Sequence, residues 1–363
     1  MLFYLPLEPY VERYTYFMSC PGGWTESWFK KYGVEFQRID GTSVGNTINT
    51  GSVLDAYGRS LYAISQVADV VRRIQCGDVH DGDVIYTEDF WHPGIESLFY
   101  IRQLTGIKFK VGCFLHAQSI DDSDFTYPMR YWMRPIEVGM SSGYDYIFTC
   151  SAILRQLAIT AGYCSGHLFK SGLPFNSQRL LEQLADVGFE PKPKEEFVLF
   201  SSRFDLEKNP HFFLDLVESC REINFKLVKP RKHLTNDQGV LQRLDRMDQS
   251  NLEIVDTSSK LAYYDLLARA KVQFNCAKQD WVSWTLLEAI TFGCVPLYPA
   301  WKDFPVELAG FEDDCIYANE DLSNAKLKIR RLMDKQFDCR LCTIVERHDQ
   351  SWRQYLTTMN LLG

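Results

Sequence analysis

Residues 273–298 constrain the fold of this chain more than any other stretch. They begin within a short apolar run that predicts a buried strand, and a polar loop follows at 277–281. Apolar residues then repeat at helix spacing as far as Gly293, a residue type that commonly ends helices, and 295–298 predict a second buried strand. This is the pattern of a βαβ unit. Its right-handed crossover brings the loop and the helix N-terminus to the carboxyl edge of a parallel sheet, where ligands bind.

Strands and helices alternate along the rest of the chain in the same way. The predicted strands are 2–5, 34–39, 83–86, 109–115 and 146–150 in the first part, and 197–201, 225–228, 252–255, 271–276, 295–298 and 315–317 in the second. This alternation predicts an α/β protein with parallel sheets. We expect one domain at 1–172, a linker at 173–196 that contains an amphipathic helix, a second domain at 197–340, and a terminal helix at 341–363 that packs back on the first domain.

The length and composition agree with two globular domains. The 363 residues are 46% hydrophobic and 24% charged, which is ordinary for a globular protein. No apolar run reaches the roughly 18 residues that a membrane-spanning helix needs. The first residues lack a basic region and are interrupted by Pro6, Glu8 and Pro9, so they do not resemble a signal peptide. We expect no membrane span and a cytoplasmic location.

Cysteine usage and net charge exclude some classes of protein. Eleven cysteines, an odd number scattered without framework spacing, predict reduced thiols. Cys339 and Cys342 form a lone CxxC without a second pair, which argues against a zinc site. The net charge of -8 argues against a non-specific nucleic-acid binder, although it leaves room for a local basic groove.

Basic residues lie where the second domain begins. A strand is predicted to end at Ser201 and a helix to begin near Pro210, so Arg203 and Lys208 lie in a strand-to-helix loop. A guanidinium fork and an ammonium group beside the free N–H groups of a helix start suit a diphosphate. The alternative is that both side chains are simply solvated.

Two carboxylates and one histidine complete the candidate cleft between the two domains. Asp280 and Glu288 lie on either side of the corner that opens the helix in 273–298, where a carboxylate can accept hydrogen bonds from hydroxyl groups. The alternative for Glu288 is a favourable interaction with the helix dipole. His116 follows a predicted strand of the first domain, where an imidazole can hold a sugar hydroxyl or have a structural role.

An aromatic and basic segment follows the His116 loop. In 125–135, FTYPMRYWMRP, aromatic residues such as Trp132 alternate with Arg130 and Arg134, a composition that can stack a base and hold phosphates. A buried aromatic lid with two surface arginines is the alternative. Arg72, Arg73, Lys229, Arg231 and Lys232 could extend a basic track. The acidic run of Asp121, Asp122 and Asp124 could suggest metal ligands, but a solvated turn is the favoured interpretation, and no metal is expected.

Arg203 and Lys208, followed along the chain by Asp280 and Glu288, resemble the motif of the retaining GT-B glycosyltransferases. The resemblance covers residues 80–320, including 146–158 (YIFTCSAILRQLA) and 291–299 (TFGCVPLYP). It implies two Rossmann-like domains facing each other across a cleft, the first on the acceptor side and the second binding a nucleotide sugar.

The resemblance also implies roles for individual residues. Arg203 and Lys208 would bind the donor diphosphate, Glu288 the ribose and Asp280 the donor sugar, with His116 facing that sugar. The whole donor set would be Ser201, Arg203, Lys208, Asp280, Trp281, Ser283, Trp284, Thr285 and Glu288, and the acceptor set His92, Arg130, Trp132 and Arg134. The chain departs from the pattern because Asp280 replaces a glutamate and because Trp281 and Ser283 replace glycines. Gly22 and Gly23 are the candidates for the first domain's glycine turn.

The expected reaction is sugar transfer with retention, in which the departing phosphate oxygen takes the acceptor proton. We expect no cofactor beyond the donor, with UDP as its nucleotide. The opening YLPLEPYVERYTYFM resembles proteins of large tailed phages, which favours a hydroxymethylated pyrimidine in double-stranded DNA as the acceptor. A saccharide, a lipid or a small molecule is the alternative acceptor. A catalytically silent sugar-nucleotide or nucleic-acid binding protein and an epimerase on the same scaffold are the alternative functions.

Overall fold

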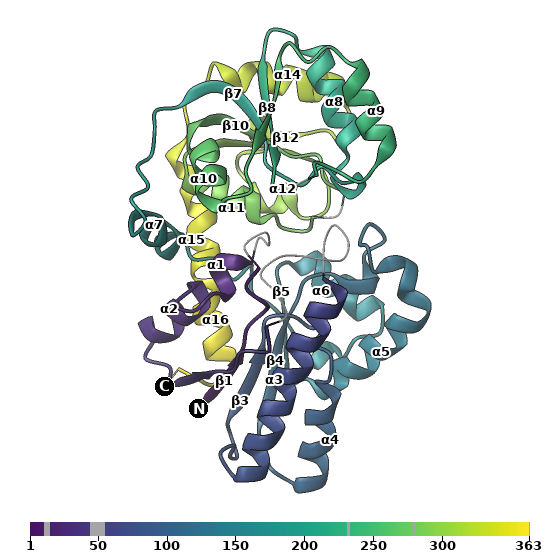
Figure 1. Ribbon diagram of the computed structural model, residues 1–363, viewed down its shortest axis with the longest axis vertical. Helices are drawn as coiled ribbons and strands as arrows, with labels where there is room; N and C mark the ends of the chain where they lie inside the picture. The colour runs from purple at the N-terminus through teal and green to yellow at the C-terminus, as the bar shows by residue number, and fades with distance from the viewer. Residues whose placement is uncertain (11–14, 44–54, 231–232, 279, 363) are drawn as a thin grey trace. The chain divides into compact units, whose positions relative to one another are not determined.

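The computed structural model of the chain describes residues 1–10, 15–43, 55–230, 233–278 and 280–362. The chain divides into two compact units (Figure 1). Unit 1 is Met1–Asn176 with His348–Gly363, and unit 2 is Ser177–Arg347. Within the described residues, no helix combines the length and apolar character that crossing a bilayer requires.

Unit 1 is built on a six-stranded parallel sheet in the order β2-β1-β3-β4-β5-β6. The strands are β1 (Leu2–Leu5), β2 (Phe36–Arg38), β3 (Val84–Thr87), β4 (Lys110–Leu115), β5 (Tyr146–Thr149) and β6 (Leu168–Lys170). The helices are α1 (Tyr16–Ser19), α2 (Trp24–Lys31), α3 (Ala56–Cys76), α4 (Glu96–Thr105), α5 (Arg130–Gly143), α6 (Ala152–Thr160) and α16 (Ser351–Thr358). Every residue of β1 and β3 is buried, as expected for central parallel strands with helices on both faces.

Aromatic residues fill one face of the unit 1 sheet. The indole of Trp352 in α16 lies edge-on to Phe29 of α2 and to Tyr86 of β3, at centroid distances of 5.6 and 6.1 Å. Tyr355, one helical turn further on, lies 4.2 Å from Phe148 of β5. In Figure 1, α3 and α4 lie on the other side of this sheet from α2 and α16. The last helix of the chain therefore belongs to the core of unit 1.

Unit 2 is built on a second six-stranded parallel sheet, in the order β12-β11-β10-β7-β8-β9. The strands are β7 (Glu195–Phe200), β8 (Asn224–Lys229), β9 (Leu252–Asp256), β10 (Ala270–Phe274), β11 (Val295–Pro299) and β12 (Ile316–Tyr317). The helices are α7 (Ser177–Ala185), α8 (Pro210–Ser219), α9 (Gln238–Arg246), α10 (Lys260–Arg269), α11 (Trp284–Thr291), α12 (Phe304–Glu307), α13 (Glu312–Cys315) and α14 (Leu322–Met333), with α15 (Cys342–Asp349) leading back to unit 1. The helices α8 and α14 pack side by side (Figure 1).

Each sheet has one switch point, the place where the strand order reverses direction. In unit 1 the chain moves from β1 to β2 on one side and from β3 to β6 on the other, so the point lies between β1 and β3. In unit 2 it lies between β7 and β10, because β8 and β9 extend one way and β11 and β12 the other. In open parallel sheets, ligands bind beyond the carboxyl ends of the strands at this point.

The predicted α/β class with two parallel sheets is confirmed. The short strand β6 was absent from the prediction, whereas α7 is the helix expected within 173–196. The stretch predicted as one terminal helix contains α15 and α16, separated at Gln350. Most of the loop predicted at 40–51 lies outside the described residues.

Candidate functional site

The loop after β7 lies at the switch point of unit 2 and carries two of the predicted cations. It contains Arg203 and then a single 3-10 turn, Leu206–Lys208. Asn209 follows with a left-handed backbone (φ 55°), and Pro210 occupies the first turn of α8, where its missing N–H costs no hydrogen bond. This sharp turn fixes the place where the Lys208 side chain leaves the backbone.

Lys208 and Asp280 are brought together from neighbouring strands. The Lys208 Nζ lies 2.5 Å from Asp280 Oδ1, and the two side chains are only 9% and 19% exposed. Burial alone would raise the pKa of Asp280, but the charge and hydrogen bond of Lys208, helped by the charge of Lys302 and by the nearby amide of Asn275, hold this pKa below its usual value. Asp280 is therefore a carboxylate at neutral pH.

Arg203 is held by carboxylates of its own loop. Its guanidinium lies 2.7 Å from Asp205 Oδ2 and 2.9 Å from Glu207 Oε1, and the side chain is 27% exposed. A fork donor of this kind can pair with a phosphate in the same bidentate way. In the described structure the guanidinium is thus positioned before any anion arrives.

Backbone contacts join the loop after β7 to the loop after β10. The N–H of Lys278 donates to the carbonyl of Glu207 at 3.0 Å. The thiol of Cys276 donates to the carbonyls of Lys208 and Asn209, both at 3.4 Å. Because of these contacts, the cations of one loop and the carboxylate of the other lie in a fixed arrangement.

Glu288 is buried in α11 and accepts hydrogen bonds from two tyrosines of α10. Tyr263 donates to Oε2 and Tyr264 to Oε1, both at 2.7 Å. Burial raises the pKa of Glu288, although the charge of Lys260 and the two tyrosine hydroxyls act in the opposite direction. A sugar hydroxyl that binds this carboxylate has to share it with, or displace, a tyrosine hydroxyl.

The remaining predicted donor residues are buried or half-buried, and two of them share a polar chain. Ser283 Oγ lies 2.7 Å from Thr285 Oγ1, which lies 3.1 Å from the Tyr298 hydroxyl. Ser201 Oγ accepts from Gln273 Nε2 at 2.9 Å. The indoles of the two predicted tryptophans, Trp281 and Trp284, are both 8% exposed. The structure therefore brings the predicted unit 2 residues to one edge of one sheet.

His116 follows β4 of unit 1. Its Nε2 lies 3.1 Å from the backbone oxygen of Glu88, and its ring packs edge-on to Phe114 at 4.7 Å. The Glu88 side chain is buried and accepts from the N–H of Leu7 at 2.9 Å and from the hydroxyls of Tyr4, Ser19 and Thr25. His116 is thus positioned by the backbone of Glu88, whose own buried carboxylate is held by these hydrogen bonds.

The predicted acceptor residues lie in different environments. His92 is 2% exposed, and burial together with the charge of Arg59 lowers the pKa of its imidazole well below the usual value. Arg134 donates to the carbonyl of Ser119, whereas Arg130 is exposed and stacks over Tyr127 at 4.2 Å. Trp132 is 39% exposed and lies edge-on to Trp91 at 6.1 Å.

The acidic run and the basic track also have local partners. Asp121 accepts from the N–H of Ser123 at 3.0 Å, and Asp124 accepts from Thr126. Among the described residues, no group of three His, Cys, Asp or Glu side chains could hold a metal ion. Arg72 and Arg73 pair with Asp69, and Lys229 lies 3.8 Å from Asp256. Arg231 and Lys232 lie outside the described residues.

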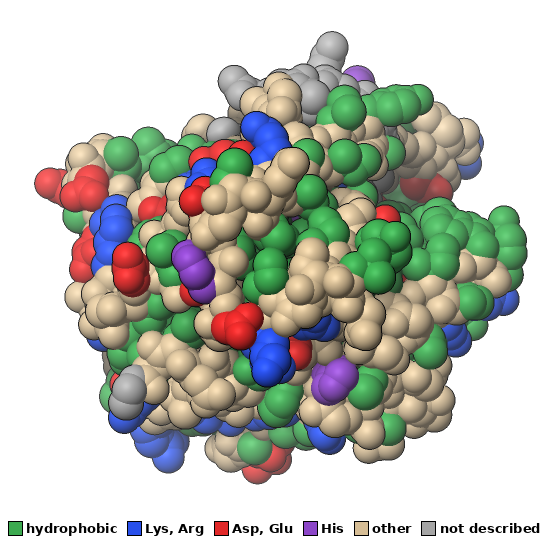
Figure 2. All heavy atoms as spheres, turned by 90° about the horizontal axis from the view of Figure 1, so that it is seen from below, with side chains coloured by type: hydrophobic (Ala, Val, Ile, Leu, Met, Phe, Trp, Pro, Cys, Tyr) green, Lys and Arg blue, Asp and Glu red, His purple; other side chains and the backbone are tan. Residues whose placement is uncertain are grey.

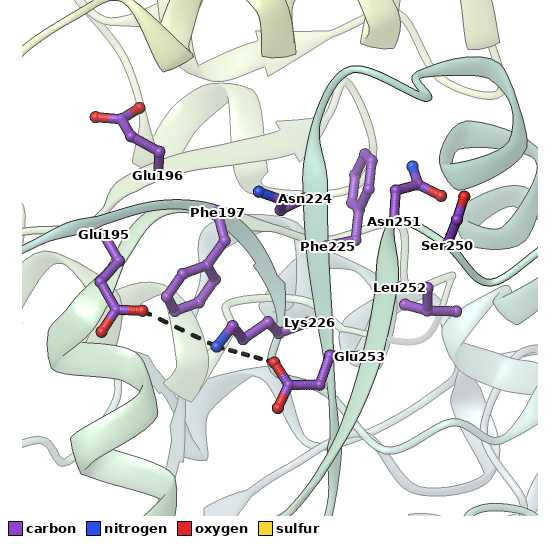
Figure 3. Close-up of a pocket in the computed structure, with 10 residues that line it drawn as sticks. All are labelled: Glu195, Glu196, Phe197, Asn224, Phe225, Lys226, Ser250, Asn251, Leu252 and Glu253. Atoms are coloured by element: carbon purple, nitrogen blue, oxygen red, sulfur yellow. Dashed lines mark ion pairs between the residues drawn. The ribbon is translucent and has the colours of Figure 1, made fainter.

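A pocket of about 470 Å³ lies at the opposite, amino edge of β7, β8 and β9 (Figure 3). Its one lysine, Lys226, is already paired, since its Nζ lies 3.0 Å from Glu253, 3.9 Å from Glu195 and 4.6 Å from the ring centroid of Phe197. Glu196 pairs with Lys271 at 2.8 Å. It contains none of the predicted site residues. Because ligands of parallel sheets bind at the carboxyl edge, the loops after β7 and β10 remain the candidate site.

Other residues of the site were not predicted from the sequence. Tyr263 and Tyr264 hold Glu288, and Lys302 lies with its ammonium 4.4 Å above the ring of Trp281. Lys302 follows β11, which lies beside β10 in the sheet. A signal for Lys302 was present in the sequence, because any residue just after a strand of a parallel sheet is a candidate at the same edge.

The fold matches those of solved glycosyltransferases. A trehalose-6-phosphate synthase studied with bisubstrate glycomimetics matches with a TM-score of 0.65 at 11% identity, covering 100% of this chain and 99% of that one. Alr3699/HepE from Anabaena, solved with UDP-glucose, matches with a TM-score of 0.56 at 10% identity, covering 99% and 95%. A chain of a GtfA/B complex matches with a TM-score of 0.55 at 13% identity over 81% of this chain, and this chain spans 61% of that one. No protein-family profile and no curated protein sequence matches the chain. The likeness confirms the expected GT-B fold.

Proposed function

We propose that the chain is a retaining glycosyltransferase that moves a sugar from a nucleotide-diphosphate donor to a hydroxyl group. The observation that carries this proposal is the contact of Lys208 with Asp280 at the switch point of unit 2, with Arg203 in the same loop. Cations in that position suit a diphosphate, and a neighbouring carboxylate suits a sugar. The likeness in fold to trehalose-6-phosphate synthase supports the same function.

In this proposal, unit 2 binds the donor and unit 1 the acceptor. Arg203 and Lys208 hold the diphosphate, Asp280 accepts a hydrogen bond from the sugar, and Glu288 binds the ribose with Tyr263 and Tyr264 at its side. A UDP-sugar is the proposed donor, because HepE was solved with UDP-glucose. None of the eleven cysteines, all within the described residues, forms a disulfide bond, which supports a reducing compartment such as the cytoplasm.

The proposed chemistry needs charge stabilisation at the leaving group. As the bond to the sugar breaks, negative charge grows on the diphosphate, and the guanidinium of Arg203 and the ammonium of Lys208 are placed to stabilise it. The departing phosphate oxygen takes the proton of the acceptor hydroxyl, which then attacks the same face of the sugar. The work on trehalose-6-phosphate synthase concerned transfer with retention, which supports the same outcome here.

The proposed acceptor stacks on the aromatic segment of unit 1. Tyr131 is 80% exposed, Trp132 is 39% exposed, and Arg130 lies beside them on the surface. A hydroxymethylated pyrimidine extruded from DNA and a saccharide ring can both stack on such rings. On the face shown in Figure 2, the described Lys and Arg side chains are scattered among Asp and Glu and form no basic patch. Between the two acceptors, the net charge of -8 favours the saccharide.

Donor binding tests the proposal directly. UDP and UDP-glucose are titrated into the wild-type protein, Arg203→Ala and Arg221→Ala by calorimetry. Arg221 is a control in the same unit, 44% exposed and paired with Asp248. Loss of the bidentate contact is expected to weaken UDP binding about 30- to 100-fold in Arg203→Ala, and the control should bind as the wild type does. Equal binding by all three proteins would remove the diphosphate assignment.

Two further measurements separate the alternatives. Slow hydrolysis of the bound donor distinguishes an enzyme from a silent binding protein, and conversion of the sugar nucleotide without acceptor would indicate an epimerase. A DNA acceptor predicts binding that weakens steeply with salt, whereas a saccharide acceptor predicts almost no salt dependence.

A further inference from the structure

Lys302 has an unusual backbone position at the candidate site. Its φ is 47°, a left-handed conformation that non-glycine residues seldom adopt. The preceding Trp301 donates its indole N–H to the carbonyl of Lys278 at 2.9 Å, which ties the loop after β11 to the loop after β10. The ammonium of Lys302 then lies 4.4 Å from the ring centroid of Trp281, the residue next to Asp280. Such left-handed residues persist where the surrounding structure fixes them and are common at functional sites.

Asp280 is surrounded by groups from three elements. Lys208 reaches it from the turn before α8, the charge of Lys302 acts on it from the loop after β11, and the amide of Asn275 lies near it at the end of β10. Tyr298 in β11 is affected by it as well: burial raises the pKa of this tyrosine, and the charge of Asp280 raises it further. Of these four groups, the two lysines carry charge.

Donor binding changes the partner of Lys208. In the proposed function, Lys208 turns to a diphosphate, which carries more negative charge than one carboxylate. Asp280 is only 19% exposed, so losing its counter-ion there is costly. A second cation that is already near Asp280 avoids this cost and keeps the carboxylate ionised for the sugar.

We propose that Lys302 is a positioning residue of the donor site, which replaces Lys208 as the counter-ion of Asp280 when Lys208 binds the diphosphate. The inference rests on the proposed function and deepens it. It assigns Lys302 to the transfer step, acting through Asp280, and leaves the binding of the diphosphate to Arg203 and Lys208.

The test compares Lys302→Met, Lys302→Arg and the control Lys278→Met. Lys278 lies in the loop after β10, but its ammonium pairs with Glu320 at 2.7 Å. UDP binding and the pH profile of UDP-glucose hydrolysis are measured for each protein. Activity of the wild type should fall as the pH falls through the pKa of Asp280, because the protonated acid no longer accepts the hydrogen bond from the sugar. We call this low-pH fall in activity the acid limb of the profile.

In Lys302→Met, this acid limb should move up by about one pH unit and turnover should fall about 10-fold, because a cation that favours the carboxylate is gone. UDP should bind within about 3-fold of the wild-type affinity, because its two cations remain. Lys302→Arg should restore the wild-type limb, and Lys278→Met should leave it in place.

An unshifted acid limb in Lys302→Met would overturn the inference, as would an equal shift in Lys278→Met. Loss of UDP binding in Lys302→Met would overturn it as well, because the side chain would then bind the diphosphate or support the fold. If the wild-type protein neither binds UDP nor hydrolyses any nucleotide sugar, the proposed function itself fails. The inference about Lys302 fails separately when the wild type is active and the pH profile of Lys302→Met is the same as that of the wild type.

Discussion

Lys208 Nζ lies 2.5 Å from Asp280 Oδ1, although the two residues are 72 positions apart in the sequence. The contact closes the switch point of the unit 2 sheet, since one residue comes from the loop after β7 and the other from the loop after β10. It places a cation and an anion together where a charged ligand is expected. The pair therefore bears both on stability and on donor binding.

Replacing Lys208 by methionine should destabilise unit 2 by about 1–2 kcal/mol, between the values for exposed and buried ion pairs, because Asp280 loses its closest counter-ion. Adding Asp280→Asn should recover about half of the loss. Chemical denaturation followed by tryptophan fluorescence measures both effects. The exposed pair of Arg221 and Asp248 is the control, and breaking it should cost well under 1 kcal/mol. If the double variant were less stable than Lys208→Met alone, the two residues would not act as a pair.

The buried Glu88 predicts a pH dependence of stability. Burial raises its pKa above the reference value of 4.5, although its hydrogen bonds from Ser19, Tyr4, Leu7 and Thr25 oppose the shift. As pH rises from 4.5, the unfolded chain loses this proton before the folded one does, so the contribution of Glu88 to stability falls with rising pH up to the folded-state pKa.

The Glu88→Gln variant should lack this contribution. Thermal unfolding of both proteins across pH 4.5 to 8, the range over which the carboxyl can titrate, should give a wild-type midpoint that declines relative to the variant. Glu35→Gln, a control at an exposed position, should show the same change of unfolding midpoint with pH as the wild type. Parallel profiles for wild type and Glu88→Gln would show that Glu88 has the same protonation state in the folded and unfolded chains.

Trp132 is expected to act on the acceptor alone. Trp132→Ala should lower transfer to the acceptor about 10-fold or more, because a stacking contact contributes about 1–3 kcal/mol, and it should leave hydrolysis of the donor unchanged. The ratio of transfer to hydrolysis is the measurement. Tyr100→Ala removes another exposed ring of unit 1, 67% exposed in α4, and should change neither rate. A parallel fall in both rates after Trp132→Ala would mean that the indole supports the fold instead.

The sequence predicted the fold because its central strands are continuous apolar runs. β1 and β3 are buried along their whole length, so their pattern was visible without knowledge of their neighbours. β6 has three residues and only one of them is buried, which left too weak a pattern. The helix α16 was visible from Trp352 and Tyr355 at helix spacing.

The site was only partly visible because its contacts are long-range. Arg203 and Lys208 follow a recognisable strand, but the pairing of Arg203 with Asp205 and Glu207 depends on a turn that the sequence does not specify. The tyrosines that hold Glu288 come from α10, and Lys302 comes from the loop after β11. Their proximity depends on the order of strands in the sheet, which single-sequence patterns do not reveal. Whether His92 is interior or exposed depends on packing in the same way.

The return of α16 to unit 1 affects the order in which the chain can fold during synthesis. Unit 2 is continuous, whereas Trp352 and Tyr355 reach the aromatic layer of unit 1 after all of unit 2 has been translated. During synthesis, the apolar side chains of β3 and β5 that α16 covers therefore stay exposed until unit 2 has left the ribosome. Termination before residue 348 would release a chain whose second unit is whole and whose first unit has lost its covering helix.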